Sequence, residues 1–109
     1  MERLFVYGTL QPGGPNEHVL TDIGGTWEPG VIKGNLVKVG WGAEMGYPGL
    51  VIDEEGDEIS GYVFVSSNLG ASWADLDAFE GDEYERVMTT VTLQNGERVE
   101  AYVYALARV

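Results

Sequence analysis

Residues 84–107, YERVMTTVTLQNGERVEAYVYALA, decide the fold more than any other stretch of this 109-residue sequence. β-branched and aromatic residues fill both halves, which predicts strands over residues 84–93 and 97–107. Asn95-Gly96 between them is a strong signal for a two-residue hairpin turn. Because side chains alternate along a strand, Tyr84 and Arg86 share one face. With a two-residue turn, the other members of that face are Met88, Val99, Val103 and Ala105.

Upstream of this hairpin the sequence predicts further short strands. Residues 4–7 form an apolar run that Gly8 interrupts, and residues 31–39 alternate around Gly34, which predicts a bend. Residues 50–52 and 59–65 are two more strands, joined by an acidic turn. The count is therefore five or six strands.

Two short helices complete the predicted elements. One covers one or two turns ending near Leu20. The other runs from about Trp73 to Phe79, with Ser72 as its cap and Gly81 just after its end. Many short strands with glycine bends favour a small mixed β-barrel in the α+β class, closed or partly closed, with the helices covering one end or side. A chain of this length is expected to form a single domain over residues 1–109.

Charge and composition exclude several classes of function. Eighteen Asp and Glu against six Lys and Arg give a formal charge of −12. Such a surface repels phosphate, so we expect neither nucleic-acid nor membrane partners. No apolar run approaches the roughly 18 residues of a membrane-spanning helix. With no cysteine and one histidine, we expect a cytoplasmic protein with no metal site.

The strand end at Tyr7-Gly8-Thr9-Leu10 is the first candidate binding element. Successive backbone N–H groups in a glycine turn can form a concave nest for a carboxylate or phosphate. An ordinary glycine turn after a core strand explains the same residues, and the four-residue motif taken alone favours that interpretation.

Glu80, Tyr84 and Arg86 form the second candidate group. Glu80 follows an apolar helix face, where a surface carboxylate is also common. An arginine on an apolar face needs an anionic partner, which is either a ligand or a protein carboxylate.

The order of these short motifs along the chain resembles the gamma-glutamylcyclotransferase-like, or AIG2-like, family. The resemblance spans nearly the whole chain, and the order and spacing of its pieces are more specific than any piece alone. They are Val6-Tyr7-Gly8-Thr9-Leu10, Gly46-Tyr47-Pro48-Gly49-Leu50, Gly61-Tyr62-Val63-Phe64, Leu76-Asp77-Ala78-Phe79-Glu80-Gly81, Tyr84-Glu85-Arg86 and Ala101-Tyr102-Val103-Tyr104.

That resemblance implies a cofactor-independent enzyme that cyclises a gamma-glutamyl group to 5-oxoproline and releases an amino acid or amine. Glu80 would be the acid/base, and the amides of Gly8, Thr9 and Leu10 would hold the glutamyl head. Tyr7, Tyr47 and Tyr84 would line the pocket, with Arg86 as a further substrate contact.

Acid/base work at neutral pH sets a condition on Glu80. The carboxylate of an ordinary glutamate is too weak a base to take a proton from an α-ammonium, so we expect burial to raise the pKa of Glu80, with Phe79 and nearby barrel aromatics contributing. The alternative is a module that binds a small carboxylate without turnover.

Overall fold

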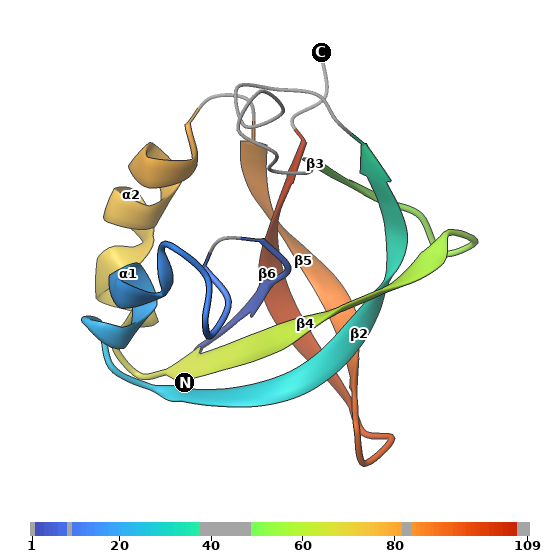
Figure 1. Cartoon of the computed structure of the whole chain (residues 1–109), viewed down its shortest axis with the longest axis horizontal. Helices are drawn as coiled ribbons and strands as arrows, with labels where there is room; N and C mark the ends of the chain where they lie inside the picture. Colours follow the sequence, from blue (N-terminus) through green and yellow to red (C-terminus); the bar gives the residue numbers. More distant parts are fainter. Residues whose placement is uncertain (1, 9, 38–48, 82–83, 107–109) are drawn as a thin grey trace.

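Six strands and two helices make up the protein in the computed structural model, which describes residues 2–8, 10–37, 49–81 and 84–106. Both helices lie on the same side of the strands (Figure 1). In chain order the elements are β1 (Glu2–Val6), α1 (Glu17–Thr21), β2 (Thr26–Val37), β3 (Gly49–Ile52), β4 (Asp57–Ser66), α2 (Leu69–Glu80), β5 (Tyr84–Leu93) and β6 (Arg98–Leu106).

Five of the strands close into a barrel. The sheet order is β3-β2-β4-β1-β6-β5, and an additional pairing of β2 with β5 joins the two ends of the five-strand part. The β1–β6 pair is parallel and the other pairs are antiparallel. Strand β3 is attached to β2 outside the closed ring. This is the mixed barrel with two helices that the sequence predicts.

Closure of the barrel depends on a glycine. Gly30 pairs with Leu93 across β2 and β5. A Cβ atom on Gly30 would lie 2.7 Å from Cγ1 of Val91, so a larger residue would push the two strands apart. The prediction for this strand began at residue 31, and the observed strand β2 is five residues longer at its start.

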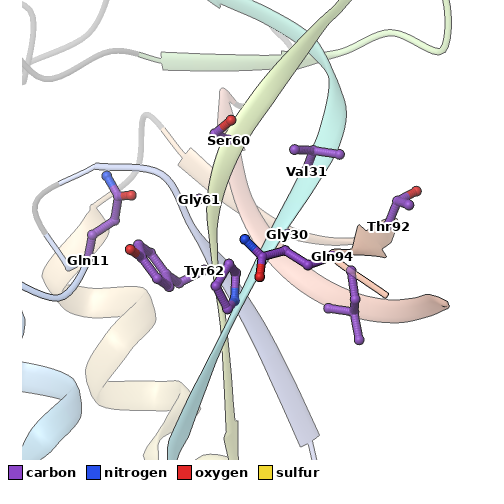
Figure 2. A pocket seen from close by; sticks show the side chains of 10 residues that line it. Gln11, Gly30, Val31, Ser60, Gly61, Tyr62, Thr92 and Gln94 are labelled. Atoms are coloured by element: carbon purple, nitrogen blue, oxygen red, sulfur yellow. The ribbon is translucent and has the colours of Figure 1, made fainter. Parts of the chain in front are cut away.

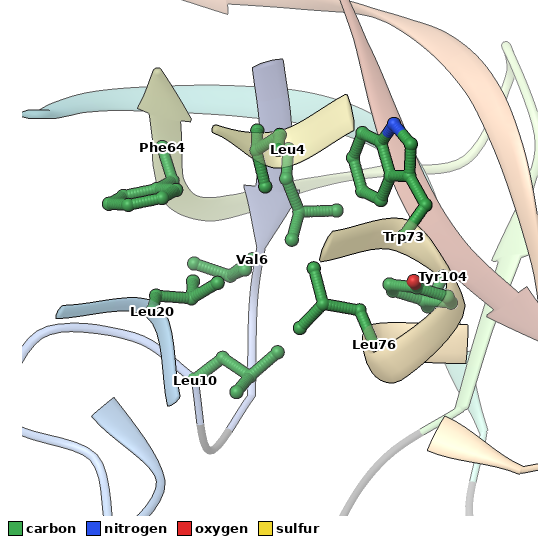
Figure 3. Close-up of a cluster of buried hydrophobic side chains, with 9 residues drawn as sticks. Leu4, Val6, Leu10, Leu20, Phe64, Trp73, Leu76 and Tyr104 are labelled. Atoms are coloured by element: carbon green, nitrogen blue, oxygen red, sulfur yellow. The ribbon is translucent and has the colours of Figure 1, made fainter. Parts of the chain in front are cut away.

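Alternation along β1 divides the buried side chains into two clusters. Phe5 points into the barrel, whereas Leu4 and Val6 point toward the helices. Figure 3 shows the helix-side cluster, in which side chains of α1 and α2 meet those of the strands. The members of that cluster are Leu4, Val6, Leu10, Leu20, Phe64, Leu69, Trp73, Leu76 and Tyr104.

The hairpin between β5 and β6 has a three-residue loop, so the predicted two-residue turn was wrong. Thr92 pairs with Arg98, and the backbone N–H of Gly96 donates to the carbonyl of Leu93 at 2.9 Å. Gly96 has φ 87° and takes the extra position, as in a turn followed by a glycine bulge. Because the loop is one residue longer than predicted, the β6 residues that were predicted to share the face of Arg86 lie on the opposite face of the sheet.

As a result, Arg86 lies opposite Tyr104, and Met88 opposite Tyr102. Val103 and Ala105, which the two-residue turn placed beside Arg86, pair with Val87 and Glu85 instead.

Helix α2 also begins earlier than predicted. Asn68 precedes its first residue, and Ser72 lies inside the helix, where its hydroxyl donates to the carbonyl of Asn68 at 3.1 Å. A serine bonded to the carbonyl four residues back belongs to a helix interior and not to a cap. Within the described ranges, no helix has the length and apolar character needed to cross a bilayer.

Candidate active site

Glu80 is the last residue of helix α2. Gly81 follows it with φ 86°, a conformation that favours glycine, and its N–H donates to the carbonyl of Asp77 at 3.1 Å. Upstream, Trp73 and Leu76 anchor the helix in the core. The carboxyl of Glu80 is thus carried at the end of a rigid element.

Glu80 is half-buried, and burial raises its pKa from 4.5 to about 7. A low-dielectric environment disfavours the ionised form, which is the reason for the direction of the change. Phe79 is 38% exposed, and its expected contribution to the burial of Glu80 stays a prediction. The carboxyl is close enough to the hydroxyls of Tyr7 and Tyr104 to raise the pKa of both when it is ionised.

Tyr7 connects the amino-terminal strand to this carboxyl. Its ring packs against the cluster inside the barrel, and its hydroxyl donates to the backbone carbonyl of Tyr104 at 2.7 Å. Burial raises the pKa of Tyr7 most, followed by its electrostatic interactions with Glu80 and Tyr84, while a hydrogen bond from the backbone of Leu50 acts the other way. The structure therefore brings three of the predicted site residues together: Tyr7, Glu80 and Tyr84.

The turn after Tyr7 is anchored by its own neighbours. The carbonyl of Gly8 accepts hydrogen bonds from the backbone N–H of Gln11 at 3.2 Å and from its side-chain Nε2 at 3.1 Å. The Leu10 side chain is buried in the helix-side cluster, so only its backbone is available to a ligand. Thr9 and Tyr47 lie outside the described residues. Binding of a carboxylate by this turn stays a prediction.

Arg86 has a protein carboxylate as its partner. Its Nε lies 3.0 Å from Oδ1 of Asp77 and its Nη2 lies 3.4 Å from Oδ2. The guanidinium also lies over two rings, 4.4 Å from the centroid of Trp73 and 5.0 Å from that of Tyr102. Of the two partners that the sequence left open, the structure contains the protein carboxylate, so contact of Arg86 with substrate stays a prediction.

Sequence reasoning missed Tyr104 and Asp77 as parts of this site. The Tyr104 hydroxyl donates to Oδ1 of Asp77 at 2.7 Å, while its backbone carbonyl holds Tyr7. The hydrogen bond from Arg86 is the main reason why the pKa of Asp77 is lowered. A three-residue hairpin loop, read from the sequence, would have placed Tyr104 opposite Arg86.

A groove of about 310 Å³ lies on the outer surface, between the turn at Gln11 and the tip of the β5–β6 hairpin (Figure 2). Because its lining carries no formal charge, it offers no counter-charge to an anionic ligand. The residues that line it are Gln11, Pro29, Gly30, Val31, Ser60, Gly61, Tyr62, Thr92, Leu93 and Gln94. Neither Tyr7 nor Glu80 belongs to this lining, so the groove is separate from their cluster. Among the described residues, no group of three or more acidic or histidine side chains converges as a metal site.

The family model described as gamma-glutamyl cyclotransferase, AIG2-like, matches residues 4–109. No curated protein matches the sequence. Among solved structures, an AIG2-like protein from Mus musculus is 28% identical with a TM-score of 0.74, and the match covers 98% of this chain and 78% of the mouse chain.

Two further structures extend the comparison to a plant and a bacterium. The Arabidopsis thaliana protein At3g28950.1 is 28% identical with a TM-score of 0.70, over 96% of this chain and 61% of its own. YkqA from Bacillus subtilis is 26% identical with a TM-score of 0.71, over 96% of this chain and 35% of its own. The likeness covers nearly all of this chain but only part of these longer proteins.

Proposed function

The chain belongs to the AIG2-like gamma-glutamyl cyclotransferase family, and from this premise we propose that it cyclises a gamma-glutamyl group to 5-oxoproline and releases an amine or amino acid. The observation that carries the proposal is the half-buried carboxyl of Glu80 with its pKa near 7. The family match supports the class of reaction, and the carboxyl supports a residue able to perform it.

The energetics of proton transfer favour Glu80 as the acid/base. Taking a proton from an α-amine with a pKa of about 7.7–8.0 costs an ordinary glutamate about 5 kcal/mol. With the pKa of Glu80 at about 7, the same transfer costs about 1 kcal/mol. Burial therefore removes most of the unfavourable free energy of the first step while leaving the carboxyl acidic enough to return the proton.

The proposed reaction balances with Glu80 as the single proton carrier. Glu80 takes one proton from the substrate's α-ammonium, and the resulting amine attacks the γ-carbonyl carbon, forming the ring C–N bond. Glu80 then protonates the leaving nitrogen as its bond to that carbon breaks, and the ring nitrogen gives its extra proton to Glu80. Glu80 passes that proton to the released amine, which leaves as an ammonium, and is a carboxylate again. Amine and carbonyl belong to one molecule, so much of the proximity advantage is already present in the substrate.

Binding of the substrate is assigned to the turn beside Tyr7. The glutamyl head carries an α-carboxylate beside its α-ammonium, and a protein of net charge −12 disfavours that carboxylate, so short-range donors must hold it. The amides of Gly8, Thr9 and Leu10 are the proposed donors, and Tyr7, Tyr47 and Tyr84 the proposed pocket wall. The outer groove does not suit this head, because it presents no cation.

Release of 5-oxoproline from a panel of substrates tests the proposal. The panel should contain gamma-glutamyl dipeptides, gamma-glutamylamines and peptides with a gamma-glutamyl isopeptide bond. We expect turnover of at least one class, a loss of at least a hundredfold in kcat for Glu80→Gln, and retained substrate binding by calorimetry.

The control is Glu100→Gln, which removes an exposed acid from β6 and should leave turnover unchanged. Binding without turnover across the whole panel would instead favour the carboxylate-binding module and overturn the enzymatic proposal.

A further inference from the structure

Asp77 joins the end of helix α2 to two neighbouring strands. One oxygen, Oδ1, accepts hydrogen bonds from the Tyr104 hydroxyl at 2.7 Å and from Nε of Arg86 at 3.0 Å. Arg86 on β5 and Tyr104 on β6 are direct partners in the sheet register. A single carboxylate thus fixes the helix against both strands at the same level of the barrel.

Arg86 is itself held in place by aromatic rings. Its guanidinium lies over Trp73, one helical turn before Asp77, and over Tyr102 on β6. The indole N–H of Trp73 donates to Oε2 of Glu2 at 3.0 Å, which ties this end of the cluster to β1. A flat cation stacked on rings and paired through two nitrogens has little freedom to move.

Tyr104 links Asp77 to Tyr7 through two hydrogen bonds. Its side chain is 4% exposed, so its hydroxyl needs a protein acceptor, and Asp77 is that acceptor. The backbone carbonyl of the same residue accepts the hydroxyl of Tyr7. Glu80 is three residues beyond Asp77 on the same helix, and the helix ends on the carbonyl of Asp77.

From these contacts we infer that Asp77 is the positioning residue of the site: it holds Arg86 and Tyr104 so that the last turn of α2 presents Glu80 to Tyr7. The inference rests on the proposed role of Glu80. Asp77 does not itself exchange a proton in this account. Its side chain is 46% exposed and its hydrogen bond from Arg86 keeps it ionised, so it differs from Glu80 in both environment and charge.

The consequence for Glu80 is a change of its surroundings. Without Asp77, Tyr104 loses its acceptor and the helix end is released toward water, which returns the carboxyl of Glu80 to a more solvated state. Among the residues that the structure describes, the titratable groups that interact with Glu80 from the strand side are Tyr7, just after β1, and Tyr104 on β6, with Tyr84 on β5 beside Tyr7. Both Tyr7 and Tyr104 are neutral at pH 7, since an ordinary tyrosine titrates near 10 and burial raises the pKa of both further.

Titration of Glu80 by carbon-13 NMR of its side-chain carboxyl tests the inference without any substrate. We compare the wild type with Asp77→Asn and with the double variant Asp77→Asn/Arg86→Gln. The single variant leaves an unpaired positive charge on Arg86, which would lower the Glu80 midpoint by electrostatics alone, whereas the double variant removes both charges. Asp75→Asn, an exposed position on the same helix, is the matched control.

We expect the midpoint of Glu80 to fall by at least one pH unit in both Asp77 variants and to stay unchanged in Asp75→Asn. An unchanged midpoint in the folded double variant overturns the inference, even where the single variant moves. Tyr104→Phe, which alters no charge, provides a second measurement. The Glu80 midpoint should also fall in this variant, and an unchanged midpoint counts against a role of Tyr104 in linking Asp77 to the site.

Kinetics separate this inference from the proposed function. With a substrate that is turned over, Asp77→Asn should lower kcat by at least tenfold with KM changed less than threefold, and the acid limb of the pH profile should move to lower pH. If no gamma-glutamyl compound is turned over, the proposed function fails while the NMR titration still decides the role of Asp77. Turnover with an unaltered Glu80 midpoint in the double variant leaves the proposed function intact and removes the positioning role.

Discussion

Replacing Glu80 by glutamine should make the protein more stable at alkaline pH. The carboxyl has a pKa of about 7 in the folded protein and 4.5 as its ordinary value, which we take for the unfolded chain. Between these two values the folded protein binds one proton more than the unfolded chain, so the free energy of unfolding decreases as pH rises. Glutamine has nearly the same shape and does not ionise, so it removes this pH dependence.

The size of the effect follows from the two pKa values. Relative to strongly acidic solution, ionisation of Glu80 destabilises the fold by about 0.8 kcal/mol at pH 5 and by about 3.3 kcal/mol at pH 8. The advantage of Glu80→Gln over the wild type should therefore grow by about 2.5 kcal/mol between these two pH values. Any constant difference caused by the amide itself cancels in this comparison.

Urea unfolding followed by tryptophan fluorescence measures the effect. The assay should run from pH 5 to pH 8.5, staying above the isoelectric point of about 4.1, where solubility is lowest. Asp77, whose pKa is lowered, loses its stabilising effect as pH falls, but it is present in both proteins and does not enter their difference. Glu100→Gln, the exposed control, should show no such trend. An advantage of Glu80→Gln that is constant across this range would refute a buried carboxyl with a raised pKa at Glu80.

Three further predictions concern the site, the barrel and the surface. The kcat/KM for a gamma-glutamyl substrate should fall about tenfold per pH unit below pH 7, because protonated Glu80 cannot accept the amine's proton. A stopped 5-oxoproline assay from pH 5.5 to 9 measures this, and a flat profile would contradict the role of Glu80 as the base. Gly61→Ala should lower the free energy of unfolding in urea by about 1–3 kcal/mol, because the added Cβ would collide with the carbonyl of Val6 and lie 2.7 Å from the Phe5 ring. Gly8→Ala, where the added Cβ meets open space, should change the stability little. With a net charge of −12, raising NaCl from 0.1 to 1 M should raise the urea midpoint, because the screening length falls from about 10 to about 3 Å; an unchanged midpoint would show that repulsion between surface carboxylates is unimportant.

Much of the fold could be predicted because its determinants are local. Alternation and β-branched residues identified the strands, and helical spacing with Gly81 located the end of α2. Where local signals conflicted with tertiary pairing, the prediction was wrong. Pro29 and Gly30 look like strand breakers in isolation, but at Pro29 the strand β2 pairs with β4 alone, since its contact with β5 is confined to Gly30 and Val31.

For the candidate site, the sequence predicted the environment that Glu80 needs, and the tertiary structure provides the groups that form that environment. The need to accept a proton from an amine predicted that Glu80 is buried, and it is half-buried. The resemblance placed Tyr7 and Tyr84 in the same pocket, but the position of Tyr104 near Glu80 could not be predicted, because these two residues are distant in the chain and meet only in the folded barrel. Phe79, the neighbour in sequence, is 38% exposed.

The sequence by itself determined the family, the strands and helices, and the position of an acidic residue at a helix end, because each depends on residues close together in the chain. The tertiary structure alone decided which side chains share a face with Arg86. One additional residue in the loop at Gly96 reverses the pleat of β6 and brings Tyr104 opposite the arginine. The packing of helix α2 brings Asp77 to the same arginine. Register is a property of two strands and their turn together, so the dipeptide Asn95-Gly96 by itself did not decide it.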